Sequence, residues 1–155
     1  MEDKQAILRL LAPKAVLKAM TAEAERAVPA PMIEAGFIGI RHFPFRLGRE
    51  SRSVTVEGEF QSAERPRFGS RKPNNDLYLL DAGEPLEISR EHFQIEATAE
   101  GYRLVDRCSA CGTGVGADRV GGEDAGGSIQ LKDGDTIAIG TETTPYIFTF
   151  ISGFT

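Results

Sequence analysis

The sequence predicts an all-β domain, a β-sandwich, preceded by an N-terminal helical segment. From residue 36 onward, short segments alternate apolar and polar residues or are rich in β-branched residues, and both patterns are typical of strands. Turn signals such as Glu100-Gly101 and Asp133-Gly134 separate these segments. Many short strands at even spacing indicate a sandwich or barrel. A chain of 155 residues can form one such domain with a proper core.

The first 31 residues have a different composition. Residues 3–27 are rich in Ala, Leu, Lys and Glu, which favours helix, and Ile7, Leu8 and Leu11 share one helical face. Pro13 predicts the start of a second helix, because proline is tolerated in a first turn. Either this segment packs on the domain, or it is a docking helix for a partner. The second helix would carry a weak apolar stripe: Val16, Leu17, Met20 and Ala24.

A domain boundary is predicted at Val28-Pro29-Ala30-Pro31. Proline has no N–H and restricts the residue before it, so this stretch cannot continue a helix. We therefore assign residues 1–31 to a helical segment with a Pro-rich linker, and residues 32–155 to the β-sandwich domain.

Eight strands are predicted in this domain, and the last of them has a strong β-propensity that suits a central or paired strand. The stretch from Glu57 to Asn75 has no clear pattern, and a long basic loop of this kind is either functional or disordered. The predicted strands are 37–40, 53–56, 76–80, 92–98, 102–105, 129–131, 136–139 and 146–151.

Charge is unevenly distributed along the chain. The net charge of −5 argues against wholesale nucleic-acid binding. Between Arg46 and Lys72, however, basic residues outnumber acidic ones, which favours a local acidic ligand over a polyanion. The alternative is a solvated charged loop. The basic residues of this stretch are Arg46, Arg49, Arg52, Arg65, Arg67, Arg71 and Lys72.

The sequence also indicates the cellular compartment of the protein. The start, Met1-Glu2-Asp3, is acidic, and Arg9 and Lys14 interrupt the early apolar residues, so no secretory signal is expected. No apolar run approaches the length of a membrane span. Two cysteines do not make a disulfide framework of the secreted kind. We therefore expect a cytoplasmic protein that does not contact a membrane.

A polar turn stands out at Ser89-Arg90-x-His92, directly before the alternating residues of a predicted strand. Two other fragments, 45–49 and 108–115, look suited to meet it, because they carry an arginine and a loop rich in small residues. An arginine, a serine hydroxyl and loop N–H groups brought together make an anion site, most naturally for phosphate.

Four motifs in order resemble the forkhead-associated (FHA) domain family: Gly48-Arg49, Ser89-Arg90-x-His92, Gly112-Thr113-x-Val115, and the strand pair of residues 129–140. The resemblance covers about residues 36–152. It implies an eleven-stranded β-sandwich whose loops at one end bind phosphothreonine peptides in signalling. It also implies no catalysis and no cofactor.

The resemblance assigns phosphopeptide contacts to three polar residues. Arg49 would contact the phosphate, since a guanidinium matches two phosphate oxygens; the alternative is a surface ion pair, for example with Glu50. Ser89 would donate its hydroxyl to the phosphate, or would be an ordinary turn serine. Arg90 would reach the phosphate or the peptide backbone, or would be a solvated charge.

Four further residues are expected to have structural roles: Gly48 would permit a tight backbone, His92 would hold loop backbone, and Gly112-Thr113 would close the third loop. Ser89 and His92 also permit an enzyme hypothesis, but a nucleophile needs a base that is itself oriented. No complete triad and no metal-ligand set is visible in the sequence.

The third loop departs from the family pattern. The family has Ser-x-Asn-Gly-Thr, with the asparagine on the peptide backbone, whereas this chain has Cys111 at that position. Ala110 stands where many members carry a hydroxyl that helps to hold the phosphate, and Gly116 replaces a second asparagine. The peptide-binding positions Ala110 and Cys111 therefore predict altered peptide specificity. The alternative function is a phosphorylation-independent scaffold or assembly module.

Cys108 and Cys111 form a C-x-x-C pair. A structural zinc site needs four ligands, and the sequence offers no second pair. A thioredoxin-like motif belongs at a helix start near a βαβ unit, which is not expected here. Two inert thiols are the first interpretation, and a reversible disulfide that controls the ligand loop is the second.

Overall fold

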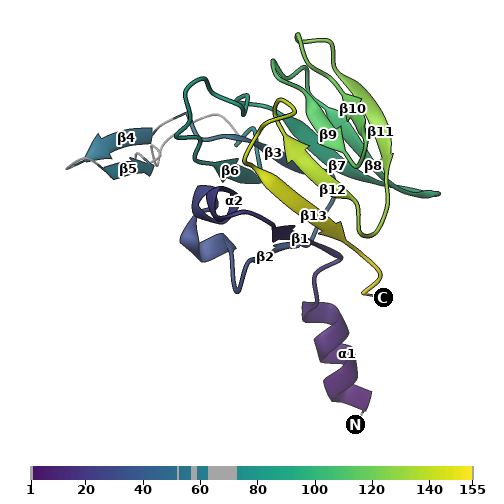
Figure 1. Ribbon diagram of the computed structural model, residues 1–155. Coiled ribbons are helices and arrows are strands. Elements are labelled where there is room, and N and C mark those ends of the chain that lie inside the picture. Colours follow the sequence, from purple (N-terminus) through teal and green to yellow (C-terminus); the bar gives the residue numbers. More distant parts are fainter. Residues whose placement is uncertain (1, 52, 57–58, 63–72, 155) are drawn as a thin grey trace.

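The computed structural model describes residues 2–51, 53–56, 59–62 and 73–154. Within these ranges the chain forms short strands with little helix (Figure 1). The helical elements are α1 (Glu2–Leu11), α2 (Ala22–Ala27) and the 3-10 helix η1 (Ala30–Met32). The strands are β1 (Ala15–Ala19), β2 (Phe37–Ile40), β3 (Phe45–Arg49), β4 (Ser53–Val56), β5 (Glu59–Ser62), β6 (Leu77–Leu79), β7 (Phe93–Thr98), β8 (Gly101–Asp106), β9 (Thr113–Val115), β10 (Asp118–Val120), β11 (Gly127–Leu131), β12 (Thr136–Ile139) and β13 (Ile147–Ile151).

Two mainly antiparallel sheets form the body of the molecule. One has six strands in the order β10-β9-β12-β13-β1-β2, and the other has five in the order β11-β8-β7-β3-β6. β4 and β5 pair only with each other, as a two-stranded hairpin, among the described residues. The predicted all-β sandwich of about eleven strands is confirmed, since the two sheets together contain eleven.

The core lies between the two sheets. Leu17 and Phe150 of the first sheet and Phe93 and Ile95 of the second are fully buried. The ring of Tyr102 on β8 meets the ring of Phe150 on β13 edge to face, with centroids 5.1 Å apart. Inward-facing residues of both sheets thus interdigitate in a single layer, as in other sandwiches.

The predicted second helix is wrong up to residue 21, and only residues 22–27 are helical, as α2. Residues 15–19 form β1, which pairs antiparallel with both β2 and β13. Helix-favouring composition gives way here because Ala15, Val16 and Leu17 are all buried, and a central strand pairs its backbone on both sides. We propose that the sandwich domain begins near residue 12, ahead of the predicted boundary at residue 31.

Most predicted strands appear close to their expected positions, but β3, of five residues, was not among the predicted strands. β5, β9 and β10 were not predicted either. Each has only three or four residues, too few for a clear alternating pattern. Five basic residues of the stretch between Arg46 and Lys72 lie outside the described residues, namely Arg52, Arg65, Arg67, Arg71 and Lys72.

The predicted first helix is present as α1, which projects from the sandwich (Figure 1). Every α1 residue whose burial the structure describes is exposed. Among the described residues, no helix is both long enough and apolar enough to cross a membrane.

Candidate functional site

Arg49 and Ser89, forty residues apart in sequence, lie side by side. Arg49 ends β3, and its backbone N–H donates to the Ser89 carbonyl at 2.9 Å. Its side-chain Nε donates to the carbonyl of Ile88, also at 2.9 Å. Two residues back, the Leu47 carbonyl accepts from the N–H of His92 at 3.0 Å. These three hydrogen bonds therefore hold the turn of residues 88–92 against the end of β3.

Gly48 makes this close approach possible. A Cβ atom at this position would lie 2.0 Å from the carbonyl oxygen of Arg90 and 2.6 Å from Nδ2 of Asn75, distances that no side chain tolerates. The same Nδ2 donates to the Arg90 carbonyl at 2.7 Å. The backbone of Arg90 is thus held against β3, while its side chain is exposed.

Donor groups remain available at this junction. Only Nε of the Arg49 guanidinium has a partner among the described residues, so its two terminal nitrogens can meet a ligand. The hydroxyl of Ser89 accepts from the N–H of Ala110 at 3.0 Å, and this leaves its own proton free to donate. A charged fork beside a directed hydroxyl is an arrangement suited to a phosphate.

His92 ties the turn to the third loop. Its ring is fully buried; Nδ1 accepts from the N–H of Ser89 at 3.0 Å, and Nε2 lies 2.8 Å from the carbonyl of Gly112. Because Nδ1 accepts, the proton sits on Nε2, which donates to Gly112. Both ring nitrogens thus bind backbone, and neither contacts the Ser89 hydroxyl as a general base would.

Protonation of His92 is expected to destabilise the fold. Burial, the largest cause, lowers the pKa of His92 below its ordinary value of 6.5, so the unfolded chain binds this proton more readily. The stability that the neutral ring contributes is complete above about pH 6.5 and is lost as the pH falls from there toward the folded pKa. We expect the free energy of unfolding, measured with urea, to fall between about pH 7.5 and 5.5.

The variant His92→Gln should flatten that part of the pH profile, because it removes the titrating group. His42→Gln is the matched control, since His42 is the only other histidine and its side chain is 64% exposed. An unchanged slope in His92→Gln would contradict this role of the ring.

A buried carboxylate shapes the third loop. Asp106, only 3% exposed, accepts from the N–H of Ser109 at 2.8 Å, from its hydroxyl at 2.7 Å, and from the hydroxyl of Thr113 at 3.0 Å. The Ser109 hydroxyl in turn accepts from the N–H of Gly112 at 3.0 Å. Gly112 has a φ of +81°, a left-handed conformation that favours glycine. Thr113 thus bonds inside the loop and does not face a ligand.

Sequence reasoning missed several residues that hold these loops. Asp106 accepts from the backbone N–H three residues on, and such local bonds from an aspartate side chain to the backbone are a recognisable sequence signal. Asn75 is buried between the Arg90 carbonyl and Nη1 of Arg107, which donates to its Oδ1 at 2.7 Å. Arg119 donates to the carbonyls of Cys111, at 3.0 Å, and Gly140. The partners of Asn75 and Arg119 are distant in sequence, so no local sequence pattern predicts these hydrogen bonds.

Ala110 and Cys111, two of the three positions that depart from the family pattern, lie in the third loop and are at least partly exposed. Ala110 is exposed, and its carbonyl accepts from the N–H of Glu123 at 2.9 Å. The half-buried Cys111 thiol lies 3.6 Å from the Leu86 carbonyl, and burial, the largest cause, raises its pKa. Cys108 and Cys111 are both free thiols. Within the described ranges, no three His, Cys, Asp or Glu residues gather as a metal site would require.

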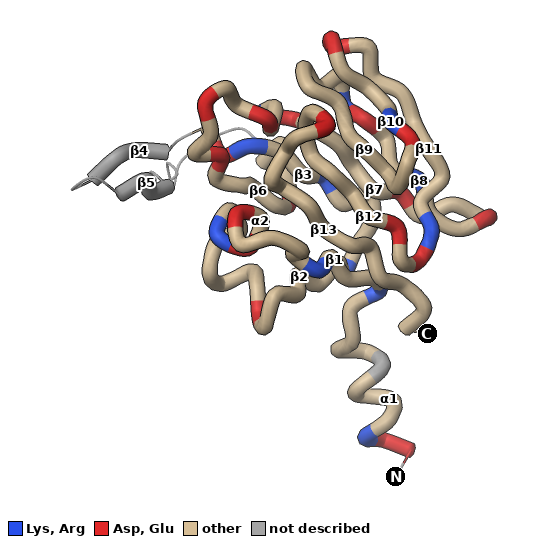
Figure 2. The backbone as a smooth tube through the Cα atoms, in the orientation of Figure 1, with Lys and Arg blue, Asp and Glu red and all other residues tan. Residues whose placement is uncertain are grey.

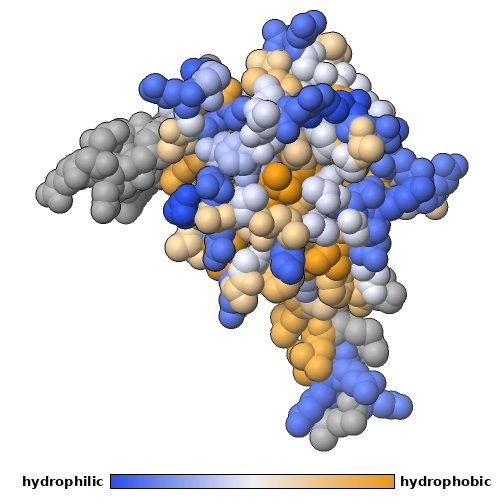
Figure 3. Space-filling model, in the orientation of Figure 1, coloured by the Kyte–Doolittle hydropathy of each residue, from blue (hydrophilic) through white to orange (hydrophobic). Residues whose placement is uncertain are grey.

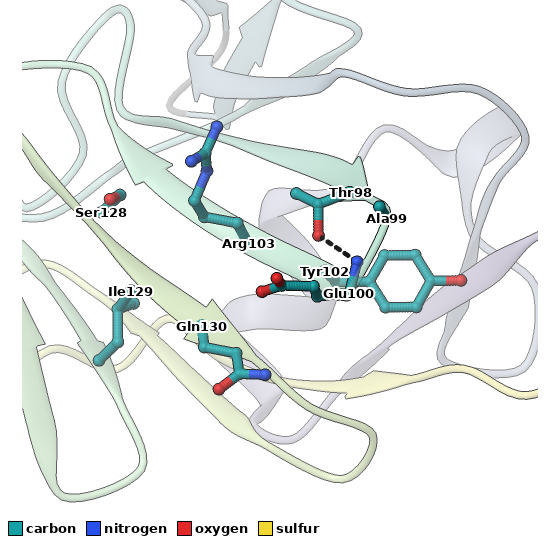
Figure 4. A pocket seen from close by; sticks show the side chains of 8 residues that line it. All are labelled: Thr98, Ala99, Glu100, Tyr102, Arg103, Ser128, Ile129 and Gln130. Atoms are coloured by element: carbon teal, nitrogen blue, oxygen red, sulfur yellow. Dashed lines mark hydrogen bonds between the residues drawn. The ribbon is translucent and has the colours of Figure 1, made fainter.

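A separate cleft of about 480 Å³ lies away from this junction (Figure 4). It surrounds the turn between β7 and β8, where the Thr98 hydroxyl accepts from the N–H of Glu100 at 3.2 Å. Since β7 runs from Phe93, next to His92, to Thr98, the cleft and the Arg49–Ser89 junction are at opposite ends of one strand. The candidate site is thus a loop surface and not this cleft.

Comparison with known proteins agrees with this architecture. The fold is a double-sheet domain in which hydrogen bonds hold several loops together at one end. The family model of the FHA domain matches residues 67–140, a little under half of the chain. Comparison with curated proteins found no match.

Solved structures with this fold include two peptide complexes. Mycobacterium tuberculosis EmbR in complex with a low-affinity phosphopeptide is 20% identical with a TM-score of 0.51; the alignment covers 99% of this chain but 30% of EmbR. An engineered FHA domain with a Myc-pTBD peptide is 16% identical with a TM-score of 0.52, and 92% of this chain and 93% of that chain are covered. The FHA-like sandwich is thereby confirmed.

Proposed function

We propose that this chain is a phosphothreonine-peptide binding module in signalling. The observation that carries the proposal is the junction of Arg49 and Ser89, where a guanidinium with two available nitrogens lies beside a hydroxyl with an available proton. Charge-assisted hydrogen bonds from such a fork are among the strongest that a protein can offer to a phosphate.

Different residues of the site contact the phosphate and the rest of the peptide. Arg49 and Ser89 bind the phosphate, and the exposed side chain of Arg90 reaches it or the adjacent peptide backbone. Ala110 and Cys111 line the path of the peptide beyond the phosphate, because the N–H of Ala110 bonds to the Ser89 hydroxyl. Both similar structures, of EmbR and of the engineered FHA domain, contain a peptide ligand, which supports a peptide partner here.

Recognition, and not catalysis, is the role proposed. Both ring nitrogens of His92 bind backbone atoms, so the part of the chain that the structure describes places no base in hydrogen-bond contact with the Ser89 hydroxyl. The proposed partner is a phosphorylated protein in the cytoplasm, and the proposed module needs no cofactor.

A second candidate is a scaffold that binds without phosphate. Ala110, Cys111 and Gly116 favour it, because none of them supplies the amide or hydroxyl that the family pattern places in these loops. In that case Arg49 and Ser89 would stabilise the junction of the loops without contacting a ligand.

One peptide library, measured in phosphorylated and unphosphorylated form, separates the two candidates. We expect binding only to phosphorylated members, with phosphothreonine preferred to phosphoserine. Equal binding of phosphorylated and unphosphorylated peptides would favour the scaffold. Equal binding of phosphothreonine and phosphoserine peptides would contradict a specificity for phosphothreonine.

Restoring the family amide is expected to strengthen peptide binding. The variant Cys111→Asn supplies an amide donor and an amide acceptor, where the thiol is a weak donor and a weak acceptor. Roughly a tenfold gain in affinity is expected from one added pair of hydrogen bonds, measured by isothermal titration with one phosphopeptide. Cys108→Asn is the matched control, since Cys108 is exposed, and an equal gain in both variants would contradict the assignment of Cys111.

A further inference from the structure

α1 exposes a continuous apolar surface (Figure 3). Ile7, Leu8, Leu10 and Leu11 are 54%, 66%, 81% and 58% exposed, respectively. On a helix these four residues fall within one arc of about 160°, because successive residues are about 100° apart, with Ile7 and Leu11 in the middle and Leu8 and Leu10 at the edges. An isolated helix of ten residues is also marginal in water. Both facts indicate that α1 packs against a partner surface.

A groove of matching character lies near the end of α1. It has a volume of about 810 Å³ and runs along β1, β2 and the segment between η1 and β2. Pro13, Val16, Ile33 and Gly39 line it, and the flanking Met32 and Phe37 are 38% and 40% exposed. The groove is thus wide enough for large aliphatic side chains, and no described segment of its own chain fills it.

The connection between α1 and β1 directs the helix away from its own groove. The N–H of Ala12 donates to the Leu8 carbonyl at 2.9 Å, and the N–H of Lys14 donates to the Ile40 carbonyl at 2.8 Å. Arg41, beside the groove, donates to the Leu11 carbonyl. Only Pro13 lies between these anchored residues, so the helix cannot fold back without breaking them.

We propose that two copies of this chain associate reciprocally, with α1 of each copy in the groove of the other. Each copy carries one helix and one groove, so a two-fold axis satisfies both contacts at once. Charge is also complementary: Asp3 and Lys4 precede the apolar arc on the same face, and the groove carries Glu34 and Arg41. Covering both helices and both grooves would bury on the order of 1,000 Å² or more, within the range of specific interfaces.

Light scattering across a concentration series tests this dimer with the full chain. The wild type is expected to be dimeric, and Leu8→Asp and Met32→Lys are each expected to weaken the dimer roughly 100-fold, because each buries an unpaired charge. An equimolar mixture of the two variants should recover a dimer, because the new aspartate on one helix then meets the new lysine in the other groove. Met20→Asp is the control, since Met20 is 50% exposed and lies outside both surfaces.

Thermal unfolding monitored by near-ultraviolet circular dichroism checks that each variant keeps its packed core. A monomeric wild type at high concentration would overturn the proposal, as would a mixture that stays monomeric. Retention of the dimer in Met32→Lys alone would also overturn it, because α1 would then pair elsewhere.

Discussion

Replacement of Arg49 by alanine is expected to abolish measurable phosphopeptide binding. The backbone N–H of Arg49 donates to the Ser89 carbonyl and its guanidinium donates to the Ile88 carbonyl, which places this charged group at the Ser89 turn. Losing two charge-assisted hydrogen bonds to phosphate costs about 3 kcal/mol or more, which corresponds to at least roughly a 100-fold loss in affinity. Isothermal titration with one phosphopeptide measures this loss.

Arg103→Ala is the matched control for that variant. Arg103 lies on β8, its side chain is 49% exposed, and it pairs with Glu96 and not with the loops of the site. Its loss should leave affinity within about twofold, since exposed ion pairs contribute little. If Arg49→Ala bound the phosphopeptide with wild-type affinity, the phosphate site would not include Arg49.

Replacement of Asp106 by alanine is expected to give the largest loss of stability. Three donors from Ser109 and Thr113 would lose their acceptor in a buried place. Each buried unsatisfied group costs about 1–3 kcal/mol, so a fall of about 3–5 kcal/mol in the free energy of unfolding is expected. Urea unfolding followed by circular dichroism measures it.

Asp118→Ala provides the comparison, because Asp118 lies exposed on β10. It should change the free energy of unfolding by no more than about 0.5 kcal/mol. If both aspartate variants unfolded at the same urea concentration, the loop would be held by contacts other than the carboxylate of Asp106.

Much of the fold was predictable because strand patterns and turn residues act locally. The alternation of Phe93 and Ile95 placed β7, and β-branched and aromatic residues placed β13. β1 was not predictable, because the composition of residues 15–19 favours helix, and their strand conformation comes from pairing with β2 and β13. Pairing of distant strands leaves no mark in a local window.

In the candidate site too, local motifs were predictable and contacts between distant residues were not. Gly48-Arg49 and Ser89 formed visible motifs, because their chemistry is local to each loop. Their proximity depends on hydrogen bonds between loops, such as those that His92 makes with Ser89 and Gly112. The contribution of Asn75 became clear only in the fold, because its partners, the Arg90 carbonyl and Arg107, lie 15 and 32 residues away.

Nuclear magnetic resonance mapping of phosphopeptide binding is the most direct test of the phosphate site that Arg49 and Ser89 form together. On titration with a phosphothreonine peptide, we predict the largest shifts at the Nε–H of Arg49 and at the backbone amides of Ser89, Arg90 and Ala110. The same peptide without phosphate should leave those signals unmoved. Shifts confined to the cleft around Tyr102, or identical shifts with both peptides, would contradict a phosphate site built by Arg49 and Ser89.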